Sequence, residues 1–179
     1  MPVAGYGIAL AREQQLGALA GIERAAAEAF ALEDLPESQR DEVTDLEELA
    51  AAQRDGRLWV ASDARGEPVG FAIVFRLAQS AHLDELAVHP AHQRRGLGRA
   101  LVRAVALWAR AVGASRLTLT TFRFVAWNLP WYERLGFVAL PEAALSHELA
   151  EIFEREIATG LPRERRVAMA LDLATGLRA

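Results

Sequence analysis

The sequence predicts an α/β domain in which amphipathic helices pack on a mixed β-sheet. Strand-like runs alternate with segments of helical hydrophobic periodicity along most of the 179 residues. A central strand is expected at 81–88, and Pro90, which cannot donate to a β-ladder, stops it. A long helix is expected directly after it. Its apolar stripe consists of Leu97, Leu101, Val105, Trp108 and Val112.

The first third of the chain is expected to hold one short strand and two helices. A strand at 6–10 precedes an amphipathic helix at 12–30. The breaker Leu35-Pro36-Glu37 then interrupts the chain, and Ser38 is expected to cap a second helix that ends near residue 54.

The middle of the chain is expected to contain a hairpin, the central strand and the long helix. Strands at 58–62 and 69–77 flank a Gly- and Pro-containing turn and so predict a hairpin. The helix at 97–112 is expected to stop at Gly113. A strand rich in β-branched residues follows at 116–122.

The last third is expected to close the sheet. A short helix at 128–135 ends at Gly136, and a strand at 137–140 follows it. A helix over 141–158 and a strand over 166–173 complete the pattern, so we expect a single domain over residues 1–179.

Composition narrows the classes of function. The chain is 52% hydrophobic and 25% charged, and it contains no stretch long and apolar enough for a membrane span and no signal-peptide pattern, so we expect a cytoplasmic protein without a membrane partner. The net charge of −4 argues against a nucleic-acid partner. All 20 basic residues are arginine and there is no cysteine, which excludes thiolate metal sites and acyl-cysteine or acyl-lysine intermediates. We expect no metal site.

A glycine-containing loop opens the long helix. It reads Gln93-Arg94-Arg95-Gly96-Leu97-Gly98 and is followed by Arg99. Such a loop directs free backbone N–H groups and the positive end of a helix at one place, so an anion, most plausibly a pyrophosphate, is expected there. Neither a Walker A sequence nor a Gly-x-Gly-x-x-Gly fingerprint is present to compete with this interpretation.

This loop matches the Q/R-x-x-G-x-G/A signature of the GCN5-related N-acetyltransferase (GNAT) superfamily. The strand ending Leu-Ala-Val-His-Pro before it, and Tyr132-Glu133-Arg134-Leu135-Gly136-Phe137 after it, also resemble that family. The resemblance implies the GNAT fold, a mixed twisted sheet of six or seven strands with helices on both faces, which splays between 81–88 and 116–122. It also implies acetyl-CoA as acyl donor. The pantetheine arm would pair with Leu86, Ala87 and Val88, and Arg94, Arg95, Gly96, Leu97, Gly98 and Arg99 would hold the pyrophosphate.

Transfer to an amine requires a base, because alkyl amines titrate near pH 10. His82 and Asp84 lie two apart on a strand and are expected to share a face, where Asp84 would raise the pKa of His82. His82 falls where many family members carry an acid–base residue. Glu85 is a reserve candidate that would join this face only through a β-bulge. Which of the three is the base, and whether His82 and Asp84 are merely structural, stays open.

Two later residues also resemble family positions. Tyr132 resembles the tyrosine whose hydroxyl lies near the CoA sulfur and can protonate the leaving thiolate, and Asn128 resembles a CoA-contacting asparagine. The gap from Asn128 to Tyr132 is shorter than is usual in the family, and Pro130 offers a structural explanation for Asn128 as part of a helix start. A structural role for Tyr132, anchoring its helix to the core, is the alternative.

The acceptor is the least defined part of the site. Four aromatic residues precede or adjoin Tyr132 and either line an apolar acceptor pocket or pack the sheet. These are Phe122, Phe124, Trp127 and Trp131. The acidic stretch 33–55 is either a solvated helix face or a wall that attracts a cationic amine. His89 and His92 are expected at the surface beside the loop.

The resemblance thus implies direct transfer of an acetyl group to a primary amine on a small molecule or peptide. A catalytically silent acyl-CoA-binding module and a transferase using a longer acyl-CoA are the alternatives. A homodimer is possible, as in many family members.

Overall fold

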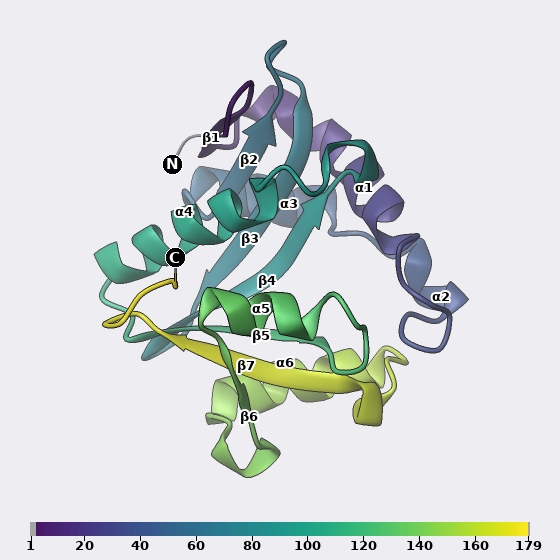
Figure 1. The fold of residues 1–179 in the computed structure, drawn as a ribbon, viewed down its shortest axis with the longest axis vertical. Helices are drawn as coiled ribbons and strands as arrows, with labels where there is room; N and C mark the ends of the chain where they lie inside the picture. Colours follow the sequence, from purple (N-terminus) through teal and green to yellow (C-terminus); the bar gives the residue numbers. More distant parts are fainter. Residues whose placement is uncertain (1–2, 179) are drawn as a thin grey trace.

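Residues 3–178 are described by a computed structural model, and seven strands within them form one sheet (Figure 1). The strand order is β1-β2-β3-β4-β5-β7-β6. The strands are β1 (Gly7–Leu10), β2 (Leu58–Ser62), β3 (Pro68–Arg76), β4 (Ser80–Val88), β5 (Arg116–Phe122), β6 (Val138–Leu140) and β7 (Arg166–Asp172). All pairs are antiparallel except β4 and β5, which run parallel.

Six α-helices within residues 3–178 accompany the sheet. They are α1 (Leu16–Ala27), α2 (Glu37–Arg40), α3 (Leu46–Arg54), α4 (Leu97–Ala111), α5 (Leu129–Leu135) and α6 (His147–Ala158). Among the helices of residues 3–178, none combines the length and apolar character that a membrane span requires.

The expected helix over 38–54 is wrong. The chain forms the one-turn helix α2, then an irregular segment, and then α3. Asp45 caps α3, because its carboxylate accepts the Glu47 N–H at 2.7 Å, whereas Ser38 lies inside α2. The pattern could not distinguish two capping residues of similar propensity that lie only seven positions apart.

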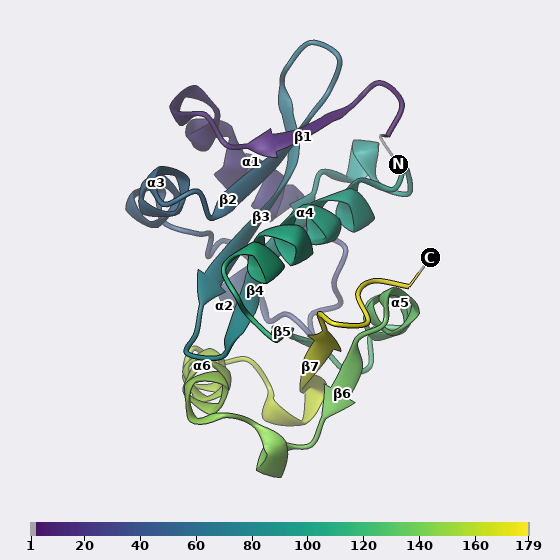
Figure 2. The same ribbon diagram turned by 90° about the vertical axis from the view of Figure 1, so that its left-hand side faces the viewer.

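The helices cover both faces of the sheet (Figure 2). On one face α4 and α5 pack over a large core that includes Leu83, Leu101 and Leu119. On the other face α1 and α3 pack over a second core, and α6 lies over β7 on this side through Leu149 and Phe153. We call these the α4 face and the α1 face. The sheet therefore separates two environments that meet at its centre.

The centre of the sheet is opened by two features of β4. Parallel pairing with β5 extends only from Ser80↔Arg116 to Leu83↔Leu119, and beyond that point β4 pairs with β3 alone. The expected splay is thereby confirmed. The β3–β4 register also shifts, because Val74 pairs with Leu83 and Ile73 pairs with Glu85, which leaves Asp84 as the extra residue of a β-bulge.

Candidate functional site

The loop before α4 presents six consecutive backbone N–H groups, those of Arg94 to Arg99. None of them donates to an acceptor within residues 3–178, since the last backbone bond before the loop is Gln93 N–H to Pro90 and the first after it is Ala100 N–H to Gly96. Unpaired donors at the positive end of a 15-residue helix form an anion site. The expected pyrophosphate site at this loop remains a prediction.

Two residues of the loop have a left-handed backbone conformation. Gly96 has φ +88° and is the N-cap of α4, while Arg94 has φ +58° and is the one non-glycine residue with positive φ among those described. This conformation is disfavoured for an arginine, and strain of this kind concentrates at functional sites. Gly98 serves a different need. A Cβ there would lie 3.3 Å from the Trp131 ring, so the glycine allows α5 to approach α4.

Side chains around the loop fix its shape. Gln93 donates to the Val88 carbonyl at 3.0 Å, and the Arg95 guanidinium reaches the Ala91 carbonyl at 3.4 Å. His89 accepts the Ala91 N–H at 3.3 Å, and the His92 ring lies 3.0 Å from the Tyr6 hydroxyl. Both histidines are half-buried rather than fully exposed at the surface. Their hydrogen bonds stabilise the conformation of the loop.

The bulge corrects the expected arrangement of the β4 side chains. Leu83 and Leu86 both join the core of the α4 face, although they lie three positions apart, while Ala87 joins the core of the α1 face. Glu85 therefore shares the α1 face with His82. Asp84 is the extra residue, so the strict alternation that paired it with His82 does not hold.

His82 is buried, with 1% of its surface exposed. Its Nδ1 lies 3.0 Å from the Thr118 hydroxyl, and that hydroxyl donates to the Ala81 carbonyl at 3.1 Å. The Thr118 hydroxyl has only one proton and donates it to Ala81, so it can only accept a hydrogen bond from His82. Nδ1 of His82 must therefore carry a proton, and Nε2 is left as an acceptor. Burial, with the positive charges of Arg166 and Arg155, lowers the pKa of His82 to about 4. The expected upward shift caused by Asp84 is wrong, because desolvation dominates.

The pKa values of the Asp84 and Glu85 carboxyl groups shift upward, in the opposite direction to that of His82. Burial, reinforced by the charges of Glu23 and Asp84, raises the pKa of Glu85 to about 8. Burial, reinforced by Glu48 and Glu156, raises the pKa of Asp84 to about 7. Asp84 is nonetheless an exposed residue of the strand, so its carboxyl group is accessible to an acceptor. Both groups titrate close to neutral pH, which suits proton transfer.

The Leu86 N–H points at the Glu85 carboxylate. Glu85 Oε1 accepts this N–H at 2.9 Å, and the contact partly opposes the rise of the Glu85 pKa. On β4, Leu86, Ala87 and Val88 follow the point where pairing with β5 ends. The Leu86 N–H expected to bind the donor is thus occupied by the neighbouring carboxylate.

Sequence reasoning missed two glutamates, Glu23 and Glu156, whose charges raise the pKa values of the β4 carboxyl groups. Glu23 comes from α1, where Thr44 donates to it through its N–H at 3.0 Å, and burial raises its pKa. Glu156 comes from α6. Helical periodicity gives no sign that either faces β4, because this depends on how α1 and α6 dock on the sheet.

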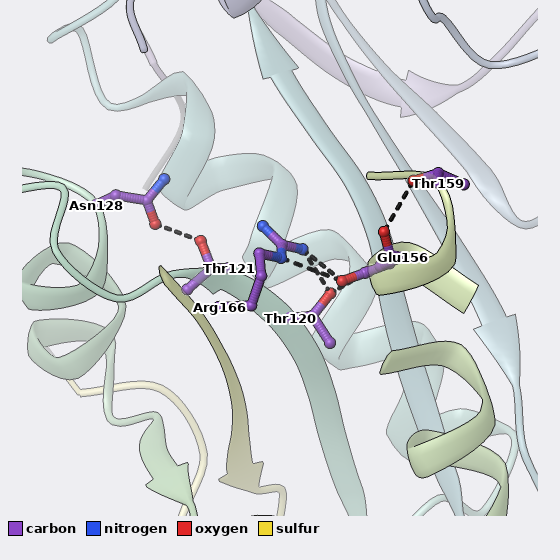
Figure 3. Close-up of polar contacts among 6 residues, drawn as sticks. All are labelled: Thr120, Thr121, Asn128, Glu156, Thr159 and Arg166. Atoms are coloured by element: carbon purple, nitrogen blue, oxygen red, sulfur yellow. Dashed lines mark hydrogen bonds and ion pairs between the residues drawn. The ribbon is translucent and has the colours of Figure 1, made fainter. Parts of the chain in front are cut away.

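Glu156 belongs to a polar network on the splayed edge of β5 (Figure 3). Arg166 donates to Glu156 through Nη2 at 2.6 Å and to the Thr120 hydroxyl at 3.1 Å, and Thr120 also donates to Glu156. The Arg166 guanidinium lies over the Phe122 ring at 4.6 Å. A buried arginine that is ion-paired in this way fixes the strand edge and supplies positive charge beside His82.

Asn128 lies at the start of α5. Its side-chain oxygen accepts the Thr121 hydroxyl, and its carbonyl accepts the Trp131 and Tyr132 N–H groups at 3.0 and 3.2 Å (Figure 3). These contacts anchor α5 to the end of β5. A contact between Asn128 and CoA remains a prediction.

Tyr132 is buried on the α4 face, and its ring packs edge-on against Trp131 and Phe137. Its hydroxyl makes no hydrogen bond to any of residues 3–178. Burial, together with the charge of Glu85, raises the pKa of this phenol well above its usual value. The hydroxyl therefore stays protonated at neutral pH. The same shift makes it a weaker acid, so complete proton donation to a thiolate is less favourable than donation of a hydrogen bond.

The four aromatic residues near Tyr132 do not form one pocket. Trp131 packs on Gly98 in the first turn of α4. Phe122 and Trp127 instead join Phe30, with ring centroids 4.6 and 5.0 Å from it. Phe124 is 59% exposed and lies under Arg165. Only the trio of Phe30, Phe122 and Trp127 stays a candidate acceptor surface.

The acidic stretch 33–55 divides in a similar way. Glu33 and Asp34 pair with Arg165 at 2.9 and 2.8 Å, which ties the segment after α1 to the start of β7. The charge of Glu48 contributes to the raised pKa of Asp84. Part of the stretch is thus structural, and part adds negative charge beside β4.

Comparison with known proteins identifies the family. The family model described as "Acetyltransferase (GNAT) family" matches residues 20–137. The streptothricin acetyltransferase of Streptomyces lavendulae is 38% identical over 85 residues, which cover 46% of this chain and 45% of that protein, so the match spans less than half of the relative's length.

Two solved structures have the same fold. N-acetylglutamate synthase from Neisseria gonorrhoeae, complexed with coenzyme A and N-acetyl-glutamate, superposes with a TM-score of 0.73 at 19% identity, over 96% of this chain and 36% of that one. PaiA N-acetyltransferase from Thermoplasma acidophilum, in complex with coenzyme A, gives 0.70 at 16% identity, over 93% and 98%. With a family model that matches well over half of its residues, the chain belongs to the GNAT acetyltransferase family.

Proposed function

We propose that this protein transfers an acetyl group directly from acetyl-CoA to a primary amine of a cationic acceptor. The observation that carries the proposal is the position of the six free N–H groups of 94–99. They open α4 beside the splay of β4 and β5, on whose other side a group of carboxyl groups titrates near neutral pH. A donor bound by the loop and an acceptor drawn to the carboxylates would meet at the splay.

Glu85 is the base in this proposal. Moving a proton from an alkylammonium of pKa about 10 to an ordinary glutamate would be uphill by roughly 8 kcal/mol, whereas the raised pKa of Glu85 reduces that gap to roughly 3 kcal/mol. His82, with a pKa of about 4, is the weaker base, and we assign it as a positioning residue on the strand. Asp84 would hold the acceptor's positive charge and could pass the proton to water.

The Leu86 N–H couples donor binding to the base. A thioester carbonyl that takes this N–H would displace the Glu85 carboxylate, which now occupies it at 2.9 Å. Loss of that hydrogen bond removes a contact that lowers the Glu85 pKa, so Glu85 becomes a stronger base when the donor is in place. Leu86 would then stabilise the negative charge that develops on the acyl oxygen.

Tyr132 would donate a hydrogen bond to the departing sulfur. The C–N bond forms as the C–S bond breaks, and the ammonium loses two protons in all. One passes through Glu85 to water, and the other ends on the thiol. The free hydroxyl of Tyr132 on the donor side of the splay supports this role.

The acceptor class rests on charge. Glu23, Glu48, Asp84, Glu85 and Glu156 gather around the strand end, and the aromatic trio of Phe30, Phe122 and Trp127 borders the α1 side. Carboxylates beside aromatic faces favour an organic cation. We propose a small polycationic amine, and the partial similarity to a streptothricin acetyltransferase supports an antibiotic amine as a first candidate.

Thiol release from acetyl-CoA with a panel of amines tests the proposal. The panel contains streptothricin, linear diamines and triamines, a neutral arylalkylamine and an N-terminal peptide. We expect release with the polycations and about tenfold or more loss of kcat in Tyr132→Phe, with CoA affinity unchanged. Tight CoA binding without release with any amine would favour a silent acyl-CoA-binding module.

A further inference from the structure

Trp131 connects two parts of the proposed site that are far apart in the sequence. It belongs to α5, and its indole ring meets Gly98 in the first turn of α4, on the face of the sheet that the two helices share. A Cβ at Gly98 would lie 3.3 Å from Cζ2 and 3.4 Å from Cη2 of the ring. The first distance is shorter than an ordinary van der Waals contact, so the indole already fills the space that a side chain at position 98 would need.

The same indole ring packs against the ring of Tyr132. The two ring centroids lie 4.8 Å apart, and the ring planes are inclined by 71°, which is an edge-to-face arrangement. Phe137 packs against Tyr132 in a similar way, with a centroid distance of 5.6 Å and an angle of 74°. The phenol of Tyr132 is therefore held between two aromatic neighbours, one of which also contacts α4.

The position of the Tyr132 hydroxyl depends on this packing. The Asn128 carbonyl accepts the N–H groups of Trp131 and Tyr132 at 3.0 and 3.2 Å, so the backbone at this end of α5 is anchored. The hydroxyl itself has no hydrogen-bond partner among residues 3–178, in contrast to His82, whose Nδ1 lies 3.0 Å from the Thr118 hydroxyl. Contacts of the ring, and not a hydrogen bond, therefore determine where the phenol oxygen lies.

The contact between Trp131 and α4 matters because of what lies at the start of that helix. The Gly98 N–H is one of the six free N–H groups that are proposed to hold the donor phosphates. The indole thus extends from the helix turn at one end of the donor to the phenol that is proposed to face the donor sulfur. A shift of the indole would move the phenol relative to the sulfur while the N–H groups of the loop stayed in place.

We propose that Trp131 is a positioning residue for the transfer reaction, which sets the place of the Tyr132 hydroxyl relative to the loop, and that position 98 is glycine because the indole occupies the space of a Cβ. The inference rests on the proposed function and adds the residue that places the phenol. Trp131 acts only through Tyr132 in this role. A change at Trp131 should therefore lower kcat without changing the affinity for CoA.

Steady-state kinetics and CoA titrations of single and double variants test this role. Trp131→Leu removes the ring and should lower kcat about fivefold, while the Kd for CoA changes by less than about twofold. In the Tyr132→Phe background the same substitution should cause no further loss of kcat, because the hydroxyl through which Trp131 acts is already absent. Trp131→Phe keeps an aromatic ring beside Tyr132 and should retain about half of the wild-type kcat or more.

Gly98→Ala tests the same contact from the side of α4. Alanine keeps the N–H of the loop, but its Cβ would displace the indole, so kcat should fall about threefold with the Kd for CoA unchanged. In the Trp131→Phe background Gly98→Ala should have no effect, because phenylalanine lacks the outer ring atoms that the Cβ would meet. Gly17→Ala is the matched control, since Gly17 is also the second residue of its helix, α1, and a Cβ there would have no neighbour within 4 Å.

Several results would overturn the positioning role. These are an added loss of kcat from Trp131→Leu in the Tyr132→Phe background, a Gly98→Ala loss that persists in the Trp131→Phe background, and a loss of CoA affinity as large as the loss of kcat. Thermal unfolding verifies that each variant folds, and the Gly98→Ala and Trp131→Phe pair decides the question by itself where Trp131→Leu does not fold. Wild-type protein that binds CoA but releases thiol with no amine would overturn the proposed function, and the positioning role with it.

Discussion

The two faces of the sheet carry charged groups of opposite kinds. On the α4 face, the charged groups near the splay are exposed arginines and backbone N–H groups, whose charge does not change near neutral pH. On the α1 face, β4 carries the imidazole of His82 and the carboxyl of Glu85, with Asp84 at the bulge between them, and the pKa values of all three groups are shifted. One strand thus separates a fixed positive site from a titrating negative one.

In the proposed function, binding of the donor phosphates and proton transfer lie on opposite faces of the sheet. Binding of the phosphates of the donor on the α4 face should depend on salt but little on pH, since their partners there are permanent charges and dipoles. Turnover on the α1 face should depend strongly on pH, since Asp84 and Glu85 change protonation between about pH 7 and 8. Substitutions on the two faces should therefore separate these two responses.

Glu85→Gln should have the largest effect. Removal of the proposed base should lower kcat by about a hundredfold or more while the Kd for CoA changes little. In the wild type, kcat/KM should rise with pH through about 8, because Glu85 must be deprotonated, and then level off. The variant should lose this rise. Glu67→Gln, an exposed glutamate of the β2–β3 turn, is the control.

Glu85→Gln should also change the stability of the protein, and the raised pKa of Glu85 determines whether the variant is more or less stable than the wild type. The pKa of Glu85 is about 8 in the folded state and 4.5 for an unperturbed glutamate, so between these pH values the folded state holds more protons than the unfolded state. Stability should then fall as pH rises from about 5 to 8. Glu85→Gln should unfold at a higher temperature than the wild type at pH 8, and the difference should vanish near pH 5. An unchanged difference across this range would contradict the raised pKa.

These two faces also differ in how well the sequence predicts them. The loop of the α4 face is a contiguous string, and its chemistry lies in the backbone, so Gly96 and the apolar stripe from Leu97 were enough to place it. All seven strands were anticipated within a residue or two for the same reason, because each is a local pattern.

The α1 face could not be predicted in this way. A β-bulge moves Asp84 out of the alternation and brings Glu85 onto the face of His82, and no local pattern marks it. Glu23 and Glu156 belong to α1 and α6, which are far apart in the sequence. The downward shift of the His82 pKa depends on its burial beside Arg166, which only the packed structure defines.

Thr118→Val should have the next largest effect and tests the buried end of the α1 face. The valine leaves the His82 Nδ1–H without its acceptor in an almost fully buried site, and we expect a loss of about 2 kcal/mol in the free energy of unfolding. Urea denaturation measures this loss. Thr118→Ser keeps the hydroxyl and should lose less than about 1 kcal/mol. Equal losses in the two variants would show that the hydroxyl contributes nothing.

Arg94→Gly should have the smallest effect and tests the α4 face. Arg94 has φ +58°, a conformation that costs an L-residue about 1 kcal/mol and glycine almost nothing. The glycine variant should therefore be slightly more stable than the wild type by thermal unfolding. It should also bind CoA several-fold more weakly, because one cation beside the loop is gone.

Arg94→Ala separates the two contributions, because it removes the charge but keeps the strained conformation. If the strain lies in the backbone, the alanine variant should be less stable than the glycine variant by about 1 kcal/mol, while both should bind CoA equally weakly. Equal stability of the two variants would mean that the positive φ carries no strain. Unequal CoA affinity would mean that the backbone shape of the loop, and not only the charge at position 94, selects the pyrophosphate. Because neither substitution touches the α1 face, the pH dependence of kcat should be the same in both.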